Sequence, residues 1–147
     1  MLVKLKIVPI SNQWLIYQEV DGSEIVIGKI RITPNSTIFL LNDSEAQLVT
    51  RKMNNKIFYK ITSNGTVLRS FYYRNRSFSF LKWKTSDDFP KILKGYLKYS
   101  RIFLKYKNSK IATSLSITKN AYILNIQSSS DFPLVVLLAS FYPFLSN

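Results

Sequence analysis

Apolar and polar residues alternate in short runs along most of the chain, and turn-forming residues separate one run from the next. In the first run Val3, Leu5 and Ile7 fall on one side. Lys4 and Lys6 fall on the other side, which is the period-two pattern of a half-buried β-strand. The same pattern predicts about twelve strands, over residues 1–7, 14–20, 24–33, 36–41, 47–52, 56–62, 66–74, 77–84, 89–99, 101–107, 110–118 and 120–127.

The residues between the runs support this assignment. Asn64 and Gly65 tolerate the positive φ angles that a two-residue hairpin turn requires, so the strands on either side of them are predicted to pair. Only the segment 89–99 is ambiguous, because its pattern fits a strand or a short helix. A helix there would bring three lysines onto one face: Lys91, Lys94 and Lys98.

The end of the chain breaks the strand pattern. Residues 132–145 form an apolar run without charge, with one proline near its start and another near its end. Proline suits the first helical position, where its missing N–H group is not needed, so we predict a helix with Pro133 in that position. Ser130 or Asp131 can cap this helix with a side-chain oxygen. Pro143 is expected to stop the helix early, because it removes a backbone donor.

This predicted helix is apolar on every side. From Leu134 to Tyr142 its only polar residue is Ser140, and a helix that is apolar all round must be buried all round. The run of 14 residues would reach about 21 Å at about 1.5 Å per residue. That is short of the roughly 30 Å hydrocarbon core of a bilayer. We therefore predict a buried core helix rather than a membrane anchor, and no transmembrane segment.

Two architectures could bury such a helix. It could cover one face of an open sheet, but then half of its circumference should be polar. A barrel could instead surround it, and closure of the barrel would also remove exposed strand edges. We therefore predict a single domain over residues 1–147 with a mainly β fold. In this fold a closed antiparallel barrel of about twelve strands surrounds the buried apolar C-terminal helix.

Composition limits the chemistry that this chain can perform. It contains no histidine and no cysteine, which removes the commonest general base, the usual metal ligands and any thiol nucleophile. Asp87 and Asp88 are adjacent, so on a strand their carboxylates would face opposite ways and could not act as a pair. No Gly-rich phosphate loop is present. We expect no enzyme activity, metal or cofactor. The first residues also lack the apolar block of a signal peptide, so a cytoplasmic location is expected.

The formal net charge of +13 is distributed unevenly. Residues 1–50 hold four basic and five acidic residues, whereas residues 51–119 hold 17 basic and two acidic residues. An imbalance of this size concerns binding partners rather than the fold. An AT-rich genome could account for many lysines, but it would not remove glutamate. We therefore favour an anionic surface as the partner of the basic segment.

Four segments resemble the tubby C-terminal-like superfamily, which includes the LURP-one-related proteins and the phospholipid scramblases. Residues 106–112, 121–127 and 131–145 are similar to that family's closing hairpin, last barrel strand and central helix, and residues 17–30 to its opening hairpin. The resemblance implies a barrel around a central helix and, for some members, a non-enzymatic role at membranes through phosphoinositide headgroups. The scramblases' calcium-binding loop, palmitoylated cysteines and membrane-spanning helix have no counterpart here. The nearest comparison is therefore with the small LURP-one-like proteins of bacterial type.

The sharpest candidate site is a basic and aromatic surface between Arg69 and Lys110. On the predicted strand 101–107, the odd-numbered residues are Phe103 and three cations, and they would share the side away from the core. We expect five residues to contact an anionic ligand: Lys82, Lys84, Arg101, Lys105 and Lys107. The alternative is a solvated exterior, where lysines keep strand edges from aggregating.

Three kinds of partner fit such a surface. An anionic membrane surface is favoured, because each Lys or Arg near it is worth about 1 kcal/mol. The protein would then associate peripherally with the inner face of the membrane. The rival hypothesis is a protein-interaction or immunity-type role, in which the basic surface binds an acidic protein. Nucleic acid ranks below lipid, because no RNP-like, KH or zinc-finger pattern is present.

Overall fold

The computed structural model describes residues 2–53, 56–73, 81–82, 93–98, 101–106, 109–118, 121–129 and 133–145. Strands follow one another along the described chain until a single helix near its C-terminal end. The elements are β1 (Leu2–Ile10), β2 (Gln13–Val20), β3 (Ser23–Ile32), β4 (Thr37–Leu41), β5 (Ser44–Met53), β6 (Lys56–Ser63), β7 (Thr66–Tyr73), β8 (Leu81–Lys82), β9 (Leu93–Lys98), β10 (Arg101–Tyr106), β11 (Ser109–Thr118), β12 (Ala121–Gln127) and α1 (Leu134–Leu145).

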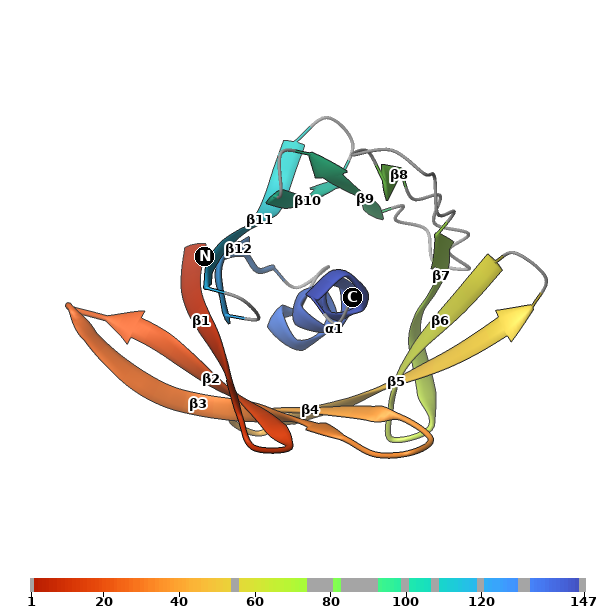
Figure 1. The fold of residues 1–147 in the computed structure, drawn as a ribbon, viewed down its shortest axis with the longest axis horizontal. Coiled ribbons are helices and arrows are strands. Elements are labelled where there is room, and N and C mark those ends of the chain that lie inside the picture. Colours follow the sequence, from red (N-terminus) through yellow and green to blue (C-terminus); the bar gives the residue numbers. More distant parts are fainter. Residues whose placement is uncertain are drawn as a thin grey trace.

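The described strands form one twelve-stranded antiparallel sheet. Its order is β7-β6-β5-β4-β3-β2-β1-β12-β11-β10-β9-β8. The chain therefore runs outward in two meanders, and the pairing of β1 with β12 joins them in the middle of the sheet. The sheet curves around α1, which lies at the centre of the view in Figure 1.

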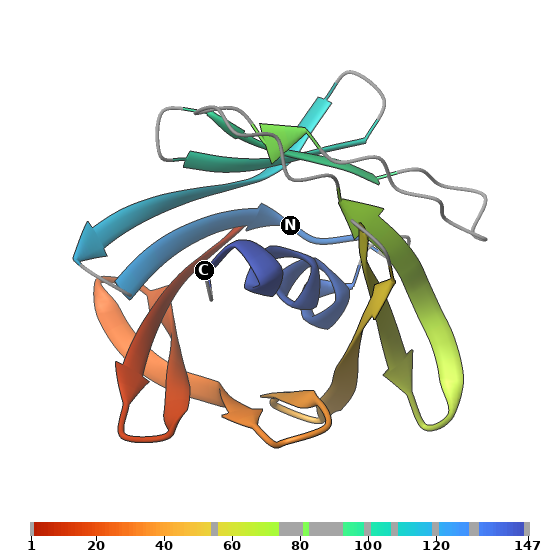
Figure 2. The same ribbon diagram turned by 45° about the vertical axis from the view of Figure 1, so that its right-hand side comes forward.

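The two edge strands of this sheet are β7 and β8. Within the described residues no pairing joins them, so the closed barrel that the sequence predicted is not shown. Closure needs hydrogen bonds between the end strands, and the part of β8 that the structure describes is Leu81–Lys82. The structure shows a mainly β fold in which one helix packs on a curved antiparallel sheet. Figure 2 shows strands above, below and to the right of this helix.

Alternation along β1 is confirmed. The side chains of Val3, Leu5 and Ile7 are buried, whereas Lys4 is exposed and Lys6 is half-buried. Successive strand residues point to opposite faces of a sheet, so this one strand defines an inner face toward α1 and an outer face away from it.

The predicted Asn-Gly turn is also confirmed. Asn64 has a φ angle of 51° and Gly65 of 78°, and Asp21 and Gly22 repeat this pattern with 50° and 79°. Positive φ at both central residues is the condition for a type I′ turn, whose twist matches that of the flanking strands. The β2–β3 and β6–β7 hairpins are therefore specified locally.

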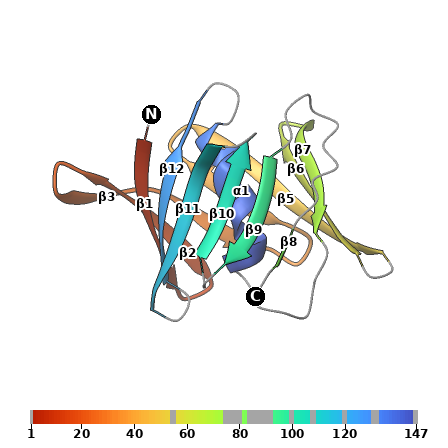
Figure 3. The same ribbon diagram turned by 90° about the horizontal axis from the view of Figure 1, so that it is seen from above.

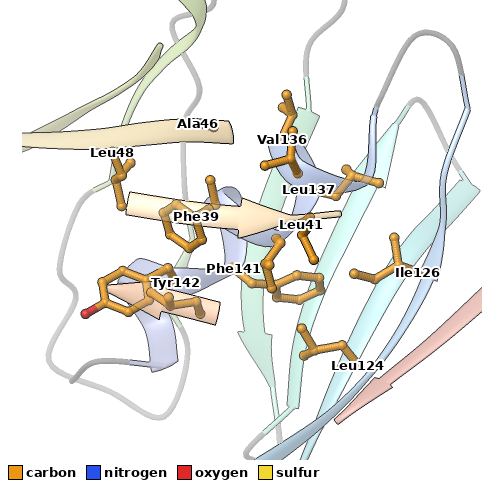
Figure 4. Packing of buried hydrophobic residues seen from close by; sticks show 14 of the residues in the cluster. Phe39, Leu41, Ala46, Leu48, Leu124, Ile126, Val136, Leu137, Phe141 and Tyr142 are labelled. Carbon is orange, nitrogen blue, oxygen red and sulfur yellow. The ribbon is translucent and has the colours of Figure 1, made fainter. Parts of the chain in front are cut away.

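The core lies between α1 and the inner face of the sheet. Every helix residue from Val135 to Tyr142 is buried, as expected for a helix that is apolar all round. The helix packs on β4, β5 and β12. Phe39 of β4 meets Tyr142 edge to face, with their ring centroids 5.5 Å apart. Figure 4 shows Phe141 and Tyr142 of the helix among buried side chains of these strands.

The helix ends differ from the prediction. Pro133 precedes the first helical residue, and its carbonyl oxygen accepts from the backbone nitrogens of Val136 and Leu137 at 3.0 and 3.1 Å. Pro143 does not stop the helix, which continues to Leu145. A proline near the end of a helix removes one backbone hydrogen bond, and both Tyr142 and Pro143 are buried at this point of α1. The predicted caps at 130–131 lie outside the described residues.

The ambiguous segment 89–99 is a strand where the structure describes it. Residues Leu93–Lys98 form β9, which pairs with β10 over its whole length. The helical alternative, with its lysines on one helix face, is therefore wrong for this part. The sequence pattern could not decide, because a short apolar run fits both periods until a neighbouring strand is present.

Candidate functional site

The structure describes three of the five predicted contact residues. Arg101 and Lys105 lie on β10, and Lys82 is the last residue of β8. Lys84 and Lys107 lie outside the described residues. The strands that carry this site, β8 to β11, form one end of the sheet, and Figure 3 shows β9, β10 and β11 side by side in front of α1.

The register of these strands brings basic positions together from separate parts of the chain. Lys105 is directly opposite Lys94 of β9 on one side and Lys110 of β11 on the other. Arg101 is directly opposite Lys98 of β9. Directly opposite residues are the closest neighbours across an antiparallel pair. The sequence pattern related Lys94 and Lys98 to each other only through the helical alternative. It did not predict that they would lie beside β10.

Two further positions extend the set toward the sheet edge. Lys82 of β8 is opposite Tyr96 of β9, and Tyr96 is opposite Phe103 of β10. The described parts of β8 to β11 hold six basic residues and no acidic one. We call this set the β8–β11 surface, and it consists of Lys82, Lys94, Lys98, Arg101, Lys105 and Lys110.

The predicted division of β10 into two sides is confirmed where its side chains are described. Leu104 is fully buried, Arg101 is exposed, and Phe103 and Lys105 are half-buried. The ammonium nitrogen of Lys110 lies 4.8 Å from the centroid of the Phe103 ring. This distance is within the range in which the ring face attracts a cation. The aromatic ring predicted within the cationic stripe is therefore in contact with a lysine.

Arg69 does not belong to the surface, although the sequence placed it at one end of the basic segment. Its side chain is only 4% exposed, and its Nη1 atom donates to Oγ of Ser140 on α1 at 2.6 Å. Ser140 in turn donates to the carbonyl oxygen of Val136 at 2.7 Å. The guanidinium carbon of Arg69 lies 4.2 Å from the centroid of the Phe71 ring. Arg69 is therefore a core residue that links β7 to the helix.

A signal for this link was present in the sequence. Ser140 is the only polar residue of the helix from Leu134 to Tyr142, and a buried hydroxyl group is expected to have hydrogen-bond partners. The sequence could show that a partner was needed, but not that it would be Arg69, because the two residues are 71 positions apart.

Other kinds of site are not found in the part of the chain that the structure describes. No group of three or more acidic residues there could hold a metal ion. No helix there is long and apolar enough to cross a bilayer. The ion pairs described, Lys4–Glu19 at 2.9 Å and Lys6–Glu24 at 3.3 Å, join β1 to β2 and β3, away from the β8–β11 surface.

Comparison with known proteins finds no match: no family model, curated protein or solved structure matches this chain. The tubby-like resemblance therefore stays a prediction from the sequence, and the geometry of the β8–β11 surface carries the functional argument.

Proposed function

We propose that this protein is a non-enzymatic binding module that associates with anionic membrane lipids through the β8–β11 surface. One observation carries the proposal. Strand register places basic residues from four consecutive strands at neighbouring positions, without an acidic residue among them. A cluster of one sign attracts an anionic surface, because the favourable interactions of the single charges add up.

Repulsion among these like charges also favours the presence of an anionic ligand. Like charges directly opposite one another destabilise an antiparallel pair, and Lys105 is opposite both Lys94 and Lys110. An anionic headgroup would relieve this repulsion. Near an anionic membrane each Lys or Arg contributes about 1 kcal/mol, so the exposed Arg101 and Lys110 and the half-buried Lys105 together favour reversible peripheral binding. The half-buried ring of Phe103, in contact with Lys110, adds an apolar element to the same surface.

We also propose that the fold is a closed tubby-like barrel and that the protein acts at a membrane surface inside the cell. The edge strands β7 and β8 are consecutive along the chain, and pairing between them would close the sheet into a barrel around α1. Burial of the helix on all sides supports this closure. In the same proposal the protein is cytoplasmic and acts at the inner face of the membrane, where the anionic lipids lie.

The test is sedimentation of the purified protein with vesicles. One set contains phosphatidylcholine alone, and the other contains added phosphatidylserine, each at low and at physiological salt. We expect binding to the anionic vesicles only, and weaker binding at the higher salt because ions screen the charges. The double variant Arg101→Glu/Lys105→Glu should lose this binding.

A matched control separates the surface from the net charge. Lys29→Glu/Arg31→Glu changes the net charge by the same amount, and these residues on β3 have the same exposure classes, one half-buried and one exposed. Figure 1 places β3 and β10 on opposite sides of α1. We expect this control to keep its binding. Equal loss in both variants would show that the surface is not the site. Absence of binding at low salt would end the lipid proposal and favour an acidic protein as the partner.

A further inference from the structure

A second feature lies on the outer face of the sheet, where β1, β2, β3 and β12 meet. There a groove with a volume of about 260 Å³ opens to solvent. Its lining combines charged residues of both signs with one aromatic and two aliphatic residues. Its lining residues are Lys4, Leu5, Lys6, Tyr17, Glu19, Glu24 and Ile123. We call this region the outer groove.

An apolar row crosses the outer groove from strand to strand. Each member is directly opposite the next one on the neighbouring strand. From β11 to β3 the members are Leu115, Ile123, Lys6, Tyr17 and Val26. The two ends of the row are well exposed, Leu115 at 41% and Val26 at 54%. The only charged member is Lys6, whose aliphatic stem can cover apolar surface. A mainly apolar row of this kind, interrupted by a single lysine, is typical of an interaction surface on an outer face.

The charges beside this row are separated by sign. Lys4 and Lys6 both lie on β1, whereas their partners Glu19 and Glu24 lie on β2 and β3. All four side chains are between 38% and 51% exposed, so these ion pairs contribute little to the stability of one molecule. A line between β1 and β2 therefore divides a positive half of the groove from a negative half.

This separation makes the face complementary to itself. Sheets that pack face to face keep their strands within about 30° of each other. A two-fold axis parallel to the strands, between β1 and β2, lays β2 of one copy over β1 of the other. It also lays β3 over β12. Glu19 of one copy then faces Lys4 of the other, and Val26 faces Ile123. The same rotation brings Tyr17 over Lys6, a pair that can form a cation–π contact.

We propose that the outer groove is the interface of a homodimer with this two-fold symmetry. Two molecules with a net charge of +13 each repel, so contact is favoured where the charge is locally balanced. Residues 1–50, which supply β1 to β3, hold four basic and five acidic residues and meet this condition. The proposal does not depend on lipid binding, because the β8–β11 surface uses other residues.

Sedimentation velocity over a wide range of protein concentrations tests the proposal. The unmodified protein is expected to form a dimer. Lys4→Glu/Lys6→Glu places acid against acid across the axis, and Glu19→Lys/Glu24→Lys places base against base. The dissociation constant of the dimer should be at least about tenfold higher for each variant than for the unmodified protein. Circular dichroism of both variants checks that they remain folded.

Mixing the two variants is the decisive measurement. In the mixture each copy offers the charges that the other lacks, so a mixed dimer should form although neither variant dimerises well alone. An arrangement through any other face predicts no such rescue. A protein that is monomeric at every concentration would overturn the proposal. A dimer that both variants leave intact would also overturn it, because the contact would then lie elsewhere.

Discussion

Arg69 and Arg101 are strand residues of the same sheet, and they differ in the face that they occupy. Arg69 lies on the inner face, 4% exposed, where it donates to Ser140 of the helix at 2.6 Å. Arg101 lies on the outer face, exposed, opposite Lys98 of β9. The inner arginine is part of the packing, and the outer one adds to the charge of a surface. The face of the sheet, and not the residue type, decides which role a cation has.

The same comparison applies to apolar residues. Phe141 of α1 is fully buried among the strands of the inner face, whereas Val49 of β5 is 38% exposed on the other side of the sheet. Burial of apolar area is the main stabilising contribution to folding, and it scales with the area removed from water. Substitutions on the two faces should therefore differ strongly in their effect on the free energy of unfolding.

The largest expected effect follows from Phe141. Phe141→Ala removes a ring that is fully buried between helix and sheet, and it should lower the free energy of unfolding by about 3–5 kcal/mol. Val49→Ala is a smaller truncation on the outer face and should stay within about 0.5 kcal/mol. Urea unfolding followed by circular dichroism measures both. Similar losses for the two variants would contradict the assignment of the inner face.

A smaller effect is expected at Arg69. Arg69→Ala removes the hydrogen bond to Ser140 and the packing on Phe71, and it should cost about 2–4 kcal/mol. Arg69→Met restores most of the volume without the charge and should recover most of this loss, because a buried charge is itself expensive. Arg101→Ala is the control and should change the free energy of unfolding by less than about 0.5 kcal/mol. A loss in Arg69→Met as large as in Arg69→Ala would assign the effect to the hydrogen bond rather than to packing.

The smallest effect concerns alkaline pH. Burial raises the pKa of Tyr122 and of Tyr142 above the ordinary value of 10.0, although a side-chain hydrogen bond with Thr37 lowers that of Tyr142 in part. These phenols ionise first in the unfolded chain, so their contribution to stability is complete below about pH 10 and is lost as the pH rises further. The free energy of unfolding should therefore fall with pH in this range.

The control for this pH dependence is Tyr122→Phe/Tyr142→Phe. Phenylalanine cannot ionise, so the decrease in stability above about pH 10 should be shallower in this variant than in the unmodified protein. Urea unfolding at several alkaline pH values gives both slopes. Equal slopes would assign the decrease to other groups, such as the lysines, and not to Tyr122 and Tyr142.

Predictions from the sequence were confirmed where they rest on residues close together in the chain. Alternation placed Val3, Leu5 and Ile7 inside, and the apolar run at the end is a buried helix. The placement of Arg69 in the basic surface was wrong, and the pairing of its strand shows why. The register between β6 and β7 shifts, so that Ile61 is opposite Arg69 and Thr62 is opposite Val67. Such a bulge adds one residue to a strand and changes the face that follows it. Hydropathy alone would have placed Arg69 outside.

The sequence by itself determined the period of most segments, the Asp21-Gly22 and Asn64-Gly65 turns and the need to bury the C-terminal helix, because these depend on neighbours along the chain. It also determined the excess of positive charge after residue 50. Only the tertiary structure decided that Lys94 and Lys110 flank Lys105 and that Arg69 meets Ser140. It alone also placed the lysines and glutamates of the outer groove on opposite sides of one line. The three lysines lie on consecutive strands and meet through strand register, which turn geometry and the buried face of the sheet set together. Arg69 and Ser140 meet through the packing of segments that are 71 positions apart.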